Sequence, residues 1–99
     1  MKLFAVMLTH GPAYQESRPL EEQKDWPAHA KFMDGLETDG FVVLGGPLEG
    51  TSDVLLIIRA NSPGEIRQRL APDPWHRQDL LRIVRISPWT LRLGSLSQR

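Results

Sequence analysis

Four stretches of the chain combine a run of apolar residues with the length of a β-strand. They cover residues 2–9, 41–44, 53–60 and 80–86. The first run is followed by His10, Gly11 and Pro12 and is too short to indicate a helix. The third run is apolar at successive positions, as in a strand that is buried on both faces. We therefore predict four strands, with the third in the centre of the sheet.

A helix is predicted between the first and second strands. Aromatic, apolar and imidazole side chains recur there at steps of three and four residues and so share one helix face. These positions are Trp26, His29, Ala30, Met33 and Leu36. Gly40 can end the helix, which should cover about residues 25–39.

A second helix is predicted between the third and fourth strands. Ser62 is suited to the N-cap, Pro63 to the first helical position, and Glu65 to the capping box that pairs with the N-cap. Ile66 would then face the core, and Pro72 would end the helix.

The predicted order is β-α-β-β-α-β, which is the ferredoxin-like arrangement of the α+β class, with two helices on one face of an antiparallel sheet. One domain would cover residues 1–99, with 88–99 as a C-terminal tail. Strands two and three are apolar on both sides, whereas the helices can cover only one. We therefore expect the second face to be buried against an identical chain in a homodimer.

The composition is that of an ordinary globular protein, with 40% hydrophobic and 24% charged residues. The absence of cysteine excludes disulfides, thiolate metal sites and a thiol nucleophile, and it favours a cytoplasmic location. The N-terminal apolar run is too short to span a membrane. Twelve basic and twelve acidic residues cancel, so we expect neither a nucleic acid nor a membrane as a partner.

His29 is the first candidate for chemistry, because the predicted helix turns it inward beside Trp26 and Met33. Desolvation favours the neutral form of a histidine, as a general base requires, and a carboxylate at its second nitrogen would fix its tautomer and orientation. The spacing alone also allows a hydrogen-bonded core histidine without any role in catalysis.

Two other short motifs have local explanations. Asp73 precedes Pro74, and an Asp-Pro pair commonly caps a helix or shapes a turn. Gly45 and Gly46, before Pro47, could let a ligand approach the backbone closely. No Lys-Ser/Thr pair follows these glycines, so they do not form a phosphate-binding loop.

The remaining histidines and tryptophans give weaker signals. His10 ends the first strand, where a pocket edge is common, whereas His76 is expected in an exposed turn. No two histidines have the spacing of a metal-ligand pair, so we predict neither a metal nor another cofactor. Trp75 and Trp89 are typical of core or dimer anchors.

Several of these residues, taken in order, resemble a known family. They are Trp26-x-x-His29-x-x-Phe32-x-x-x-Leu36, Gly40, Gly45-Gly46-Pro47, Gly50 and Asp73-Pro74-Trp75. In order and spacing they are similar to the YCII-related domain over nearly the whole chain. The resemblance implies a dimeric α+β barrel in which a histidine and an aspartate face each other in a cleft, as the active site.

At the matching positions His29 and Asp73 would be the catalytic pair, with Asp73 orienting His29. Related dehalogenating and lactone-isomerising enzymes act on small cyclic compounds by proton transfer, so the resemblance implies a lyase or an isomerase. We expect further residues to bind the small organic substrate. They are His10, Trp26, Gly46, Pro47 and Trp75.

Two functions stay open at this point. In the first, His29 is the general acid or base of a cofactor-independent enzyme. In the second, the same pocket binds a small ligand without catalysis, in an accessory or regulatory dimer. The two differ in whether His29 reaches a cavity of ligand size or is enclosed by Trp26 and Met33.

Overall fold

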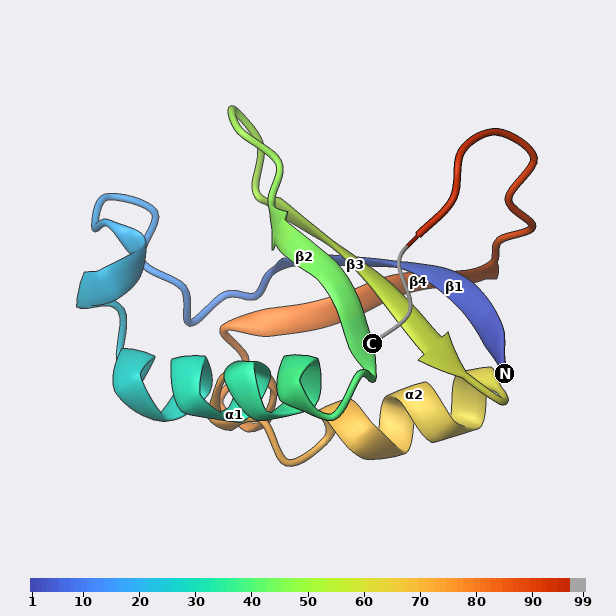
Figure 1. Ribbon diagram of the computed structural model, residues 1–99. Coiled ribbons are helices and arrows are strands. Elements are labelled where there is room, and N and C mark those ends of the chain that lie inside the picture. The colour runs from blue at the N-terminus through green and yellow to red at the C-terminus, as the bar shows by residue number, and fades with distance from the viewer. Residues whose placement is uncertain (97–99) are drawn as a thin grey trace.

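The structure, a computed structural model, describes residues 1–96, and its strands form a single antiparallel sheet (Figure 1). The strands are β1 (Lys2–His10), β2 (Val42–Pro47), β3 (Asp53–Ala60) and β4 (Leu81–Pro88), in the spatial order β2-β3-β1-β4. The helices are the 3-10 helix η1 (Leu20–Glu22), α1 (Trp26–Thr38), α2 (Pro63–Leu70) and the short α3 (Pro74–Arg77). The predicted ferredoxin-like α+β class is confirmed, with β3 in the interior of the sheet.

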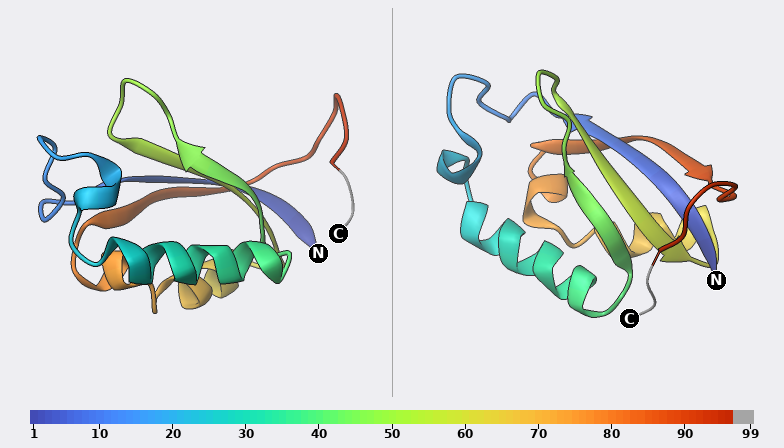
Figure 2. Two further views of the ribbon diagram at one scale, coloured as in Figure 1. Left: turned by 60° about the vertical axis from the view of Figure 1, so that its left-hand side comes forward. Right: turned by 45° about the horizontal axis from the view of Figure 1, so that its top comes forward.

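The helices lie on one face of the sheet only (Figure 2). Side chains of a strand alternate between its two faces, so β1 shows which face is covered. Phe4 and Val6 point toward the helices and are at most 1% exposed. The alternate residues Ala5 and Met7 lie on the opposite face and are half-buried. That opposite face is apolar as well, because Leu55 and Ile57 of β3 pair with Met7 and Ala5.

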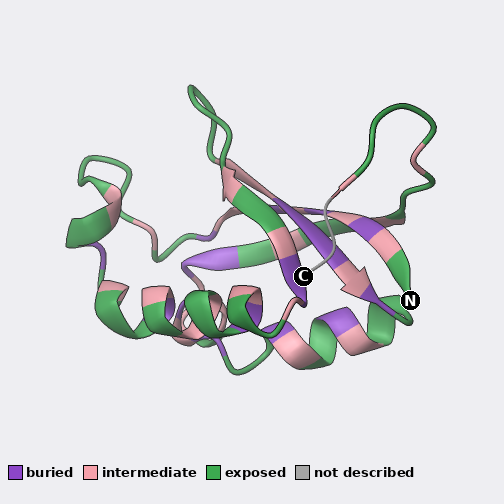
Figure 3. Cartoon of the chain, in the orientation of Figure 1, coloured by how far each residue is buried: buried purple, intermediate pink, exposed green. Residues whose placement is uncertain are grey.

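The core fills the space between the sheet and the helices, where the buried segments of Figure 3 gather. Its most enclosed side chains are less than 2% exposed and come from β1, β3, α2, α3 and the segment before β4. They are Phe4, Val6, Ile58, Ile66, Trp75 and Leu80. None of the helices within residues 1–96 has both the length and the apolar character needed to cross a membrane.

Strand β2 is longer than predicted. It continues through Gly45 and Gly46 to Pro47, although the sequence suggested that these residues close the strand. A Cβ atom on Gly45 would lie 2.6 Å from the side chain of Leu56, so glycine allows the close pairing with β3. Pro47 is tolerated because β2 is an edge strand, where a missing N–H leaves no ladder bond unmade.

The segment after α2 also differs from the prediction. Asp73-Pro74 was expected to cap a helix or to shape a turn, and it caps the one-turn helix α3, which the sequence did not predict and which runs to Arg77. The fourth strand extends to Pro88, the first residue of the predicted tail, and the backbone N–H of Trp89 still donates to the carbonyl of Leu3. Residues 97–99 of the predicted tail lie outside the described part of the chain.

The start of α2 follows the predicted capping pattern with one change. The hydroxyl of Ser62 accepts from the backbone N–H of Glu65 at 3.2 Å. The carboxylate of Glu65 reaches back one residue further than in the usual capping box and accepts from the N–H of Asn61 at 2.7 Å. Two backbone donors at this helix end are therefore satisfied by side chains.

Replacing Ser62 with alanine should lower the free energy of unfolding by about 1 kcal/mol, because an N-cap hydroxyl is lost while the helix remains. Urea denaturation would measure the change. Ser17→Ala is the matched control, since the hydroxyl of Ser17 makes no hydrogen bond among residues 1–96 and its loss should leave the unfolding midpoint in place. Equal midpoints for Ser62→Ala and the wild type would contradict the capping role.

Candidate functional site

A buried histidine and a buried aspartate form a hydrogen-bonded pair between the helices. The Nδ1 atom of His29, on α1, lies 2.8 Å from Oδ1 and 3.0 Å from Oδ2 of Asp73. Their side chains are only 10% and 5% exposed. The structure thus brings together two residues that are 44 positions apart in the chain.

The carboxylate of Asp73 makes a second contact besides the one with His29. Asp73 is the N-cap of α3, and its Oδ1 accepts from the backbone N–H of Trp75 at 3.0 Å. The local explanation of the Asp-Pro motif, a helix cap, therefore holds alongside the contact with His29. Because one carboxylate serves both, the start of α3 and the orientation of the imidazole are fixed together.

Trp75 holds the face of the same imidazole. The rings of His29 and Trp75 are stacked, with centroids 3.9 Å apart and an interplanar angle of 3°. The indole is itself fixed, since its Nε1–H donates to the carbonyl of Lys24 at 2.6 Å and its side chain is 1% exposed. Trp26 adds a tilted ring 5.9 Å from His29. The imidazole is therefore held at one edge and on one face.

The contact with Asp73 determines which nitrogen of His29 is left for chemistry. A carboxylate accepts hydrogen bonds, so Nδ1 must carry the hydrogen and Nε2 of the neutral ring has the free lone pair. Nε2 makes no hydrogen bond among the described residues, and this atom is not fully buried. This is the arrangement that a general base requires.

A cavity of about 760 Å³ opens beside this pair, between α1, α3, strand β2 and the turn that follows it. His29 borders the cavity, and Trp26 and Met33 form part of the wall without closing the imidazole off. The residues predicted to bind substrate lie in the same lining. They are His10, Trp26, Gly46, Pro47 and Trp75. A space of this volume is typical of a small-molecule site.

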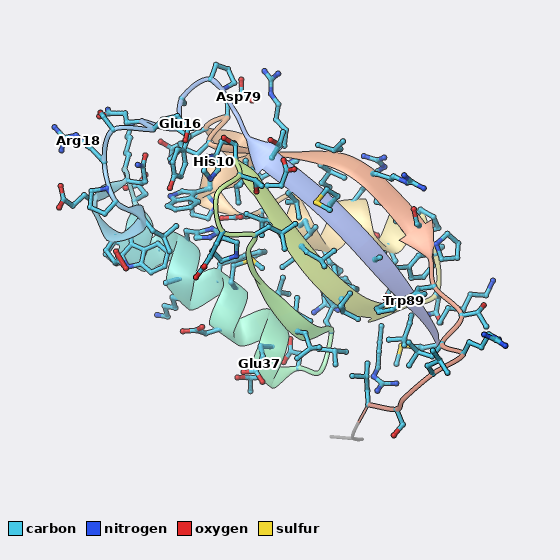
Figure 4. All side chains as sticks on the ribbon, turned by 90° about the horizontal axis from the view of Figure 1, so that it is seen from above. His10, Glu16, Arg18, Glu37, Asp79 and Trp89 are labelled. Carbon is cyan, nitrogen blue, oxygen red and sulfur yellow. The ribbon has the colours of Figure 1, made fainter. Side chains whose placement is uncertain are left out.

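His10 lies at the far end of β1, in a cluster that the sequence did not reveal (Figure 4). Its Nδ1 is 2.9 Å from Oε2 of Glu16, and its ring stacks on Tyr14 with centroids 3.5 Å apart. Burial, together with the negative charges of Glu16 and Glu21, raises the pKa of Tyr14. The phenol therefore keeps its proton at neutral pH.

The loop that carries Tyr14 and Glu16 is anchored at both ends. At its start, a Cβ atom on Gly11 would lie 2.1 Å from the carbonyl oxygen of Asp79, so only glycine fits there. At its end, the buried amide of Gln23 donates to the carbonyls of Gln15 and Arg18. The loop is thereby held beside the cavity. Spacing gave no indication of these contacts, since the segment has no periodic pattern.

The sequence predicted that His76 lies in an exposed turn, and this prediction is wrong. His76 lies within α3, is half-buried and borders the cavity, and its Nδ1 is buried without a hydrogen-bond partner among the described residues. The reason is that residues 74–77 form a helix that packs against the sheet instead of a solvated turn. Among residues 1–96, no group of three or more histidine, aspartate or glutamate side chains is placed to hold a metal ion.

The family model described as the YCII-related domain matches residues 2–90. The chain belongs to the YCII-related domain family. The resemblance drawn from the sequence motifs is thus confirmed for the family, and the match includes both His29 and Asp73. No curated protein matches this YCII-related chain.

The contact between Asp73 and His29 gives a prediction for NMR. In the wild type, the Nδ1–H of His29 is shared with a carboxylate and shielded from solvent, so it should give a slowly exchanging, strongly downfield resonance. Asp73→Asn should shift this resonance upfield or remove it, because the neutral amide is a weaker acceptor than the carboxylate. Proton NMR of 15N-histidine-labelled protein would measure the change.

Asp39→Asn is the matched control for that experiment. Asp39 is exposed at the end of α1 and pairs with Arg69 at 3.3 Å, so its change should leave the His29 signal in place. An identical downfield signal in Asp73→Asn and the wild type would mean that the carboxylate does not hold the imidazole.

Proposed function

We propose that this YCII-related protein is a cofactor-independent enzyme that moves a proton on a small cyclic or enolisable organic substrate, with His29 as the general acid and base. The observation that supports it most directly is the buried contact of His29 Nδ1 with Asp73 at 2.8 Å, beside a cavity of about 760 Å³. The absence of cysteine suits a protein of the reducing cytoplasm.

The proposed step needs only the groups already described. The lone pair on Nε2 of His29 takes a proton from a carbon next to a carbonyl, and the electrons of the broken C–H bond move into an enolate. The new imidazolium keeps its other N–H against Asp73, whose negative charge stabilises it. Return of the proton to a different carbon gives an isomerase, whereas loss of a leaving group from the enolate gives a lyase.

The walls of the cavity fit a substrate with an apolar, ring-sized body. Trp26 presents aromatic surface beside His29, and its ring centroid is 5.7 Å from that of the buried Trp75. Apart from the residues adjacent to it in the chain, none of residues 1–96 has an atom within 4 Å of the position that a Cβ on Gly46 would occupy, so its backbone is open to a close neighbour. Such a wall can exclude water around a reacting centre, which strengthens the contact between the imidazolium and the carboxylate.

The alternative function is a non-catalytic module in which the same cavity only binds a small ligand. The paired, stacked imidazole favours the enzyme, because a binding wall does not require a histidine with one nitrogen anchored by a carboxylate and the other left without a partner. Proton exchange distinguishes the two functions. An enzyme would exchange C–H protons of a bound compound with water, whereas a binding module would not.

The test is a hydrogen–deuterium exchange screen. Small enolisable ketones, lactones and cyclic acids that raise the melting temperature would be incubated with the protein in D2O, and loss of the C–H signal would be followed by NMR. The wild type should catalyse exchange in at least one ligand, and His29→Gln should slow it by about 100-fold or more, the usual loss with a general base.

Lys31→Gln is the control for the exchange screen, since Lys31 is exposed on the same helix and does not border the cavity. Its exchange rate should match that of the wild type. Compounds that bind the wild type and never exchange, across the whole screen, would favour the non-catalytic module.

The enzyme is further proposed to be a homodimer, joined through the sheet face that the helices leave uncovered. Ala5, Met7 and Leu55 are half-buried on this face, and Leu44 on β2 is 56% exposed. The face is thus a broad apolar surface, of a kind that marks an interaction site on a small domain. A second copy of the same sheet offers an equally apolar, self-complementary partner.

Sedimentation velocity at micromolar concentration should therefore give the mass of a dimer, and Leu55→Glu should give a monomer, since it buries a charge at the proposed interface. Gln68→Glu adds the same charge on the exposed side of α2 and should leave the dimer intact. A wild-type chain that sediments as a stable monomer would refute the dimer.

A further inference from the structure

A second histidine at the cavity repeats the geometry of His29. His10 has Nδ1 at 2.9 Å from the carboxylate of Glu16, just as His29 has Nδ1 at 2.8 Å from Asp73. Each imidazole also stacks on an aromatic ring, His10 on Tyr14 and His29 on Trp75. Both histidines border the same cavity.

The two clusters are linked through their aromatic rings. The rings of Tyr14 and Trp75 make an edge-to-face contact, with centroids 6.0 Å apart and planes at 85°. Glu16 is held in turn, since the hydroxyl of Ser52 donates to the same oxygen that faces His10, at 3.4 Å. The side chain of His10 is 13% exposed, whereas that of Glu16 is 61% exposed. The imidazole is thus held in the wall of the cavity by a carboxylate that is itself exposed to solvent.

The carboxylates fix the hydrogen-bonding character of both imidazoles. Because each Nδ1 donates to a carboxylate, each neutral ring is left with Nε2 as an acceptor. Neither Nε2 makes a hydrogen bond within residues 1–96. A ligand that reaches both Nε2 atoms therefore meets two acceptors, and it would satisfy them with O–H, N–H or an acidic C–H group.

The charges of the residues that line the cavity also restrict which ligands can bind. Among the described residues, the cavity is bordered by carboxylate side chains and by no lysine or arginine. The carboxylates include those of Asp34, Glu49 and Asp73. A ligand with its own carboxylate would enter a negative field without a permanent cation to receive it, whereas a neutral or positively charged ligand meets no such repulsion.

We propose that the cavity selects neutral or cationic hydrogen-bond donors with an apolar, ring-sized body, that His10 is a second binding imidazole for them, and that it rejects carboxylates. The inference deepens the proposed function by naming the substrate class of the same site. It narrows the candidates to alcohols, amines and neutral enolisable carbonyl compounds, in place of organic acids.

Four matched probes test the selection: 2-naphthalenemethanol, its methyl ether, 2-naphthylmethylamine and 2-naphthoate. They share one ring system and differ in donor and charge. Titrations followed by the histidine side-chain signals in 15N NMR would give the dissociation constants. We expect the alcohol and the amine to bind about tenfold more tightly than the ether and the carboxylate, and to shift the Nε2 signals of both His10 and His29.

His10→Phe is the matched variant, since it preserves a ring against Tyr14 but removes both nitrogens. It should reduce the preference for the alcohol over the ether to about threefold or less. Glu16→Gln is the second variant, for the case in which His10→Phe does not fold. It keeps the shape of the side chain and should shift the tautomer balance of His10, so that the preference for the alcohol falls while the signal of His29 stays unchanged.

Three results would overturn the inference. They are 2-naphthoate binding as tightly as the alcohol, an alcohol preference unchanged in His10→Phe or Glu16→Gln, and no binding of any probe at millimolar concentration. Binding is measured without turnover, so its outcome is separate from that of the deuterium exchange screen. A protein that binds these donors but exchanges no proton would keep the inference and lose the enzymatic function.

Discussion

The contact between Asp73 and His29 is the constraint on which the rest of the site depends. Asp73 begins α3 by accepting from the N–H of Trp75, and the indole that follows two residues later stacks on the same imidazole. The helix start, the carboxylate and the aromatic face are therefore parts of one short segment. When α3 packs beside α1, the imidazole is held at its edge and on its face by one element.

The uneven covering of the sheet explains how such a small domain can have both a cavity and a second, apolar surface for the proposed dimer. The helices occupy one face, and the cavity lies on that side, between α1, α3 and the β2–β3 hairpin (Figures 1 and 2). Met7 and Leu55 on the other face are only half-buried, so they can meet the proposed second chain. Proposed catalysis and proposed assembly thus use opposite sides of the same four strands.

Most of the fold could be predicted from local patterns. The run from Asp53 to Ala60 was predicted with the bounds it has, because its continuous apolar character is distinctive of an interior strand. The cap at Ser62 was likewise visible, since it depends on residues within one turn. The end of β2 and the existence of α3 were missed, because close pairing against Leu56 and packing of residues 74–77 are set by distant segments.

The sequence by itself determined the α+β class, the family and the inward position of His29, because periodicity and capping act over a few residues and the motifs keep a fixed order. Only the tertiary structure decided that Asp73 meets His29 across 44 positions, and that Glu16, in a segment without any periodic pattern, meets His10. The physical reason is that a hydrogen bond between side chains requires atoms within about 3 Å. Such proximity depends on how the helices and loops pack on the sheet, which spacing along the chain does not encode.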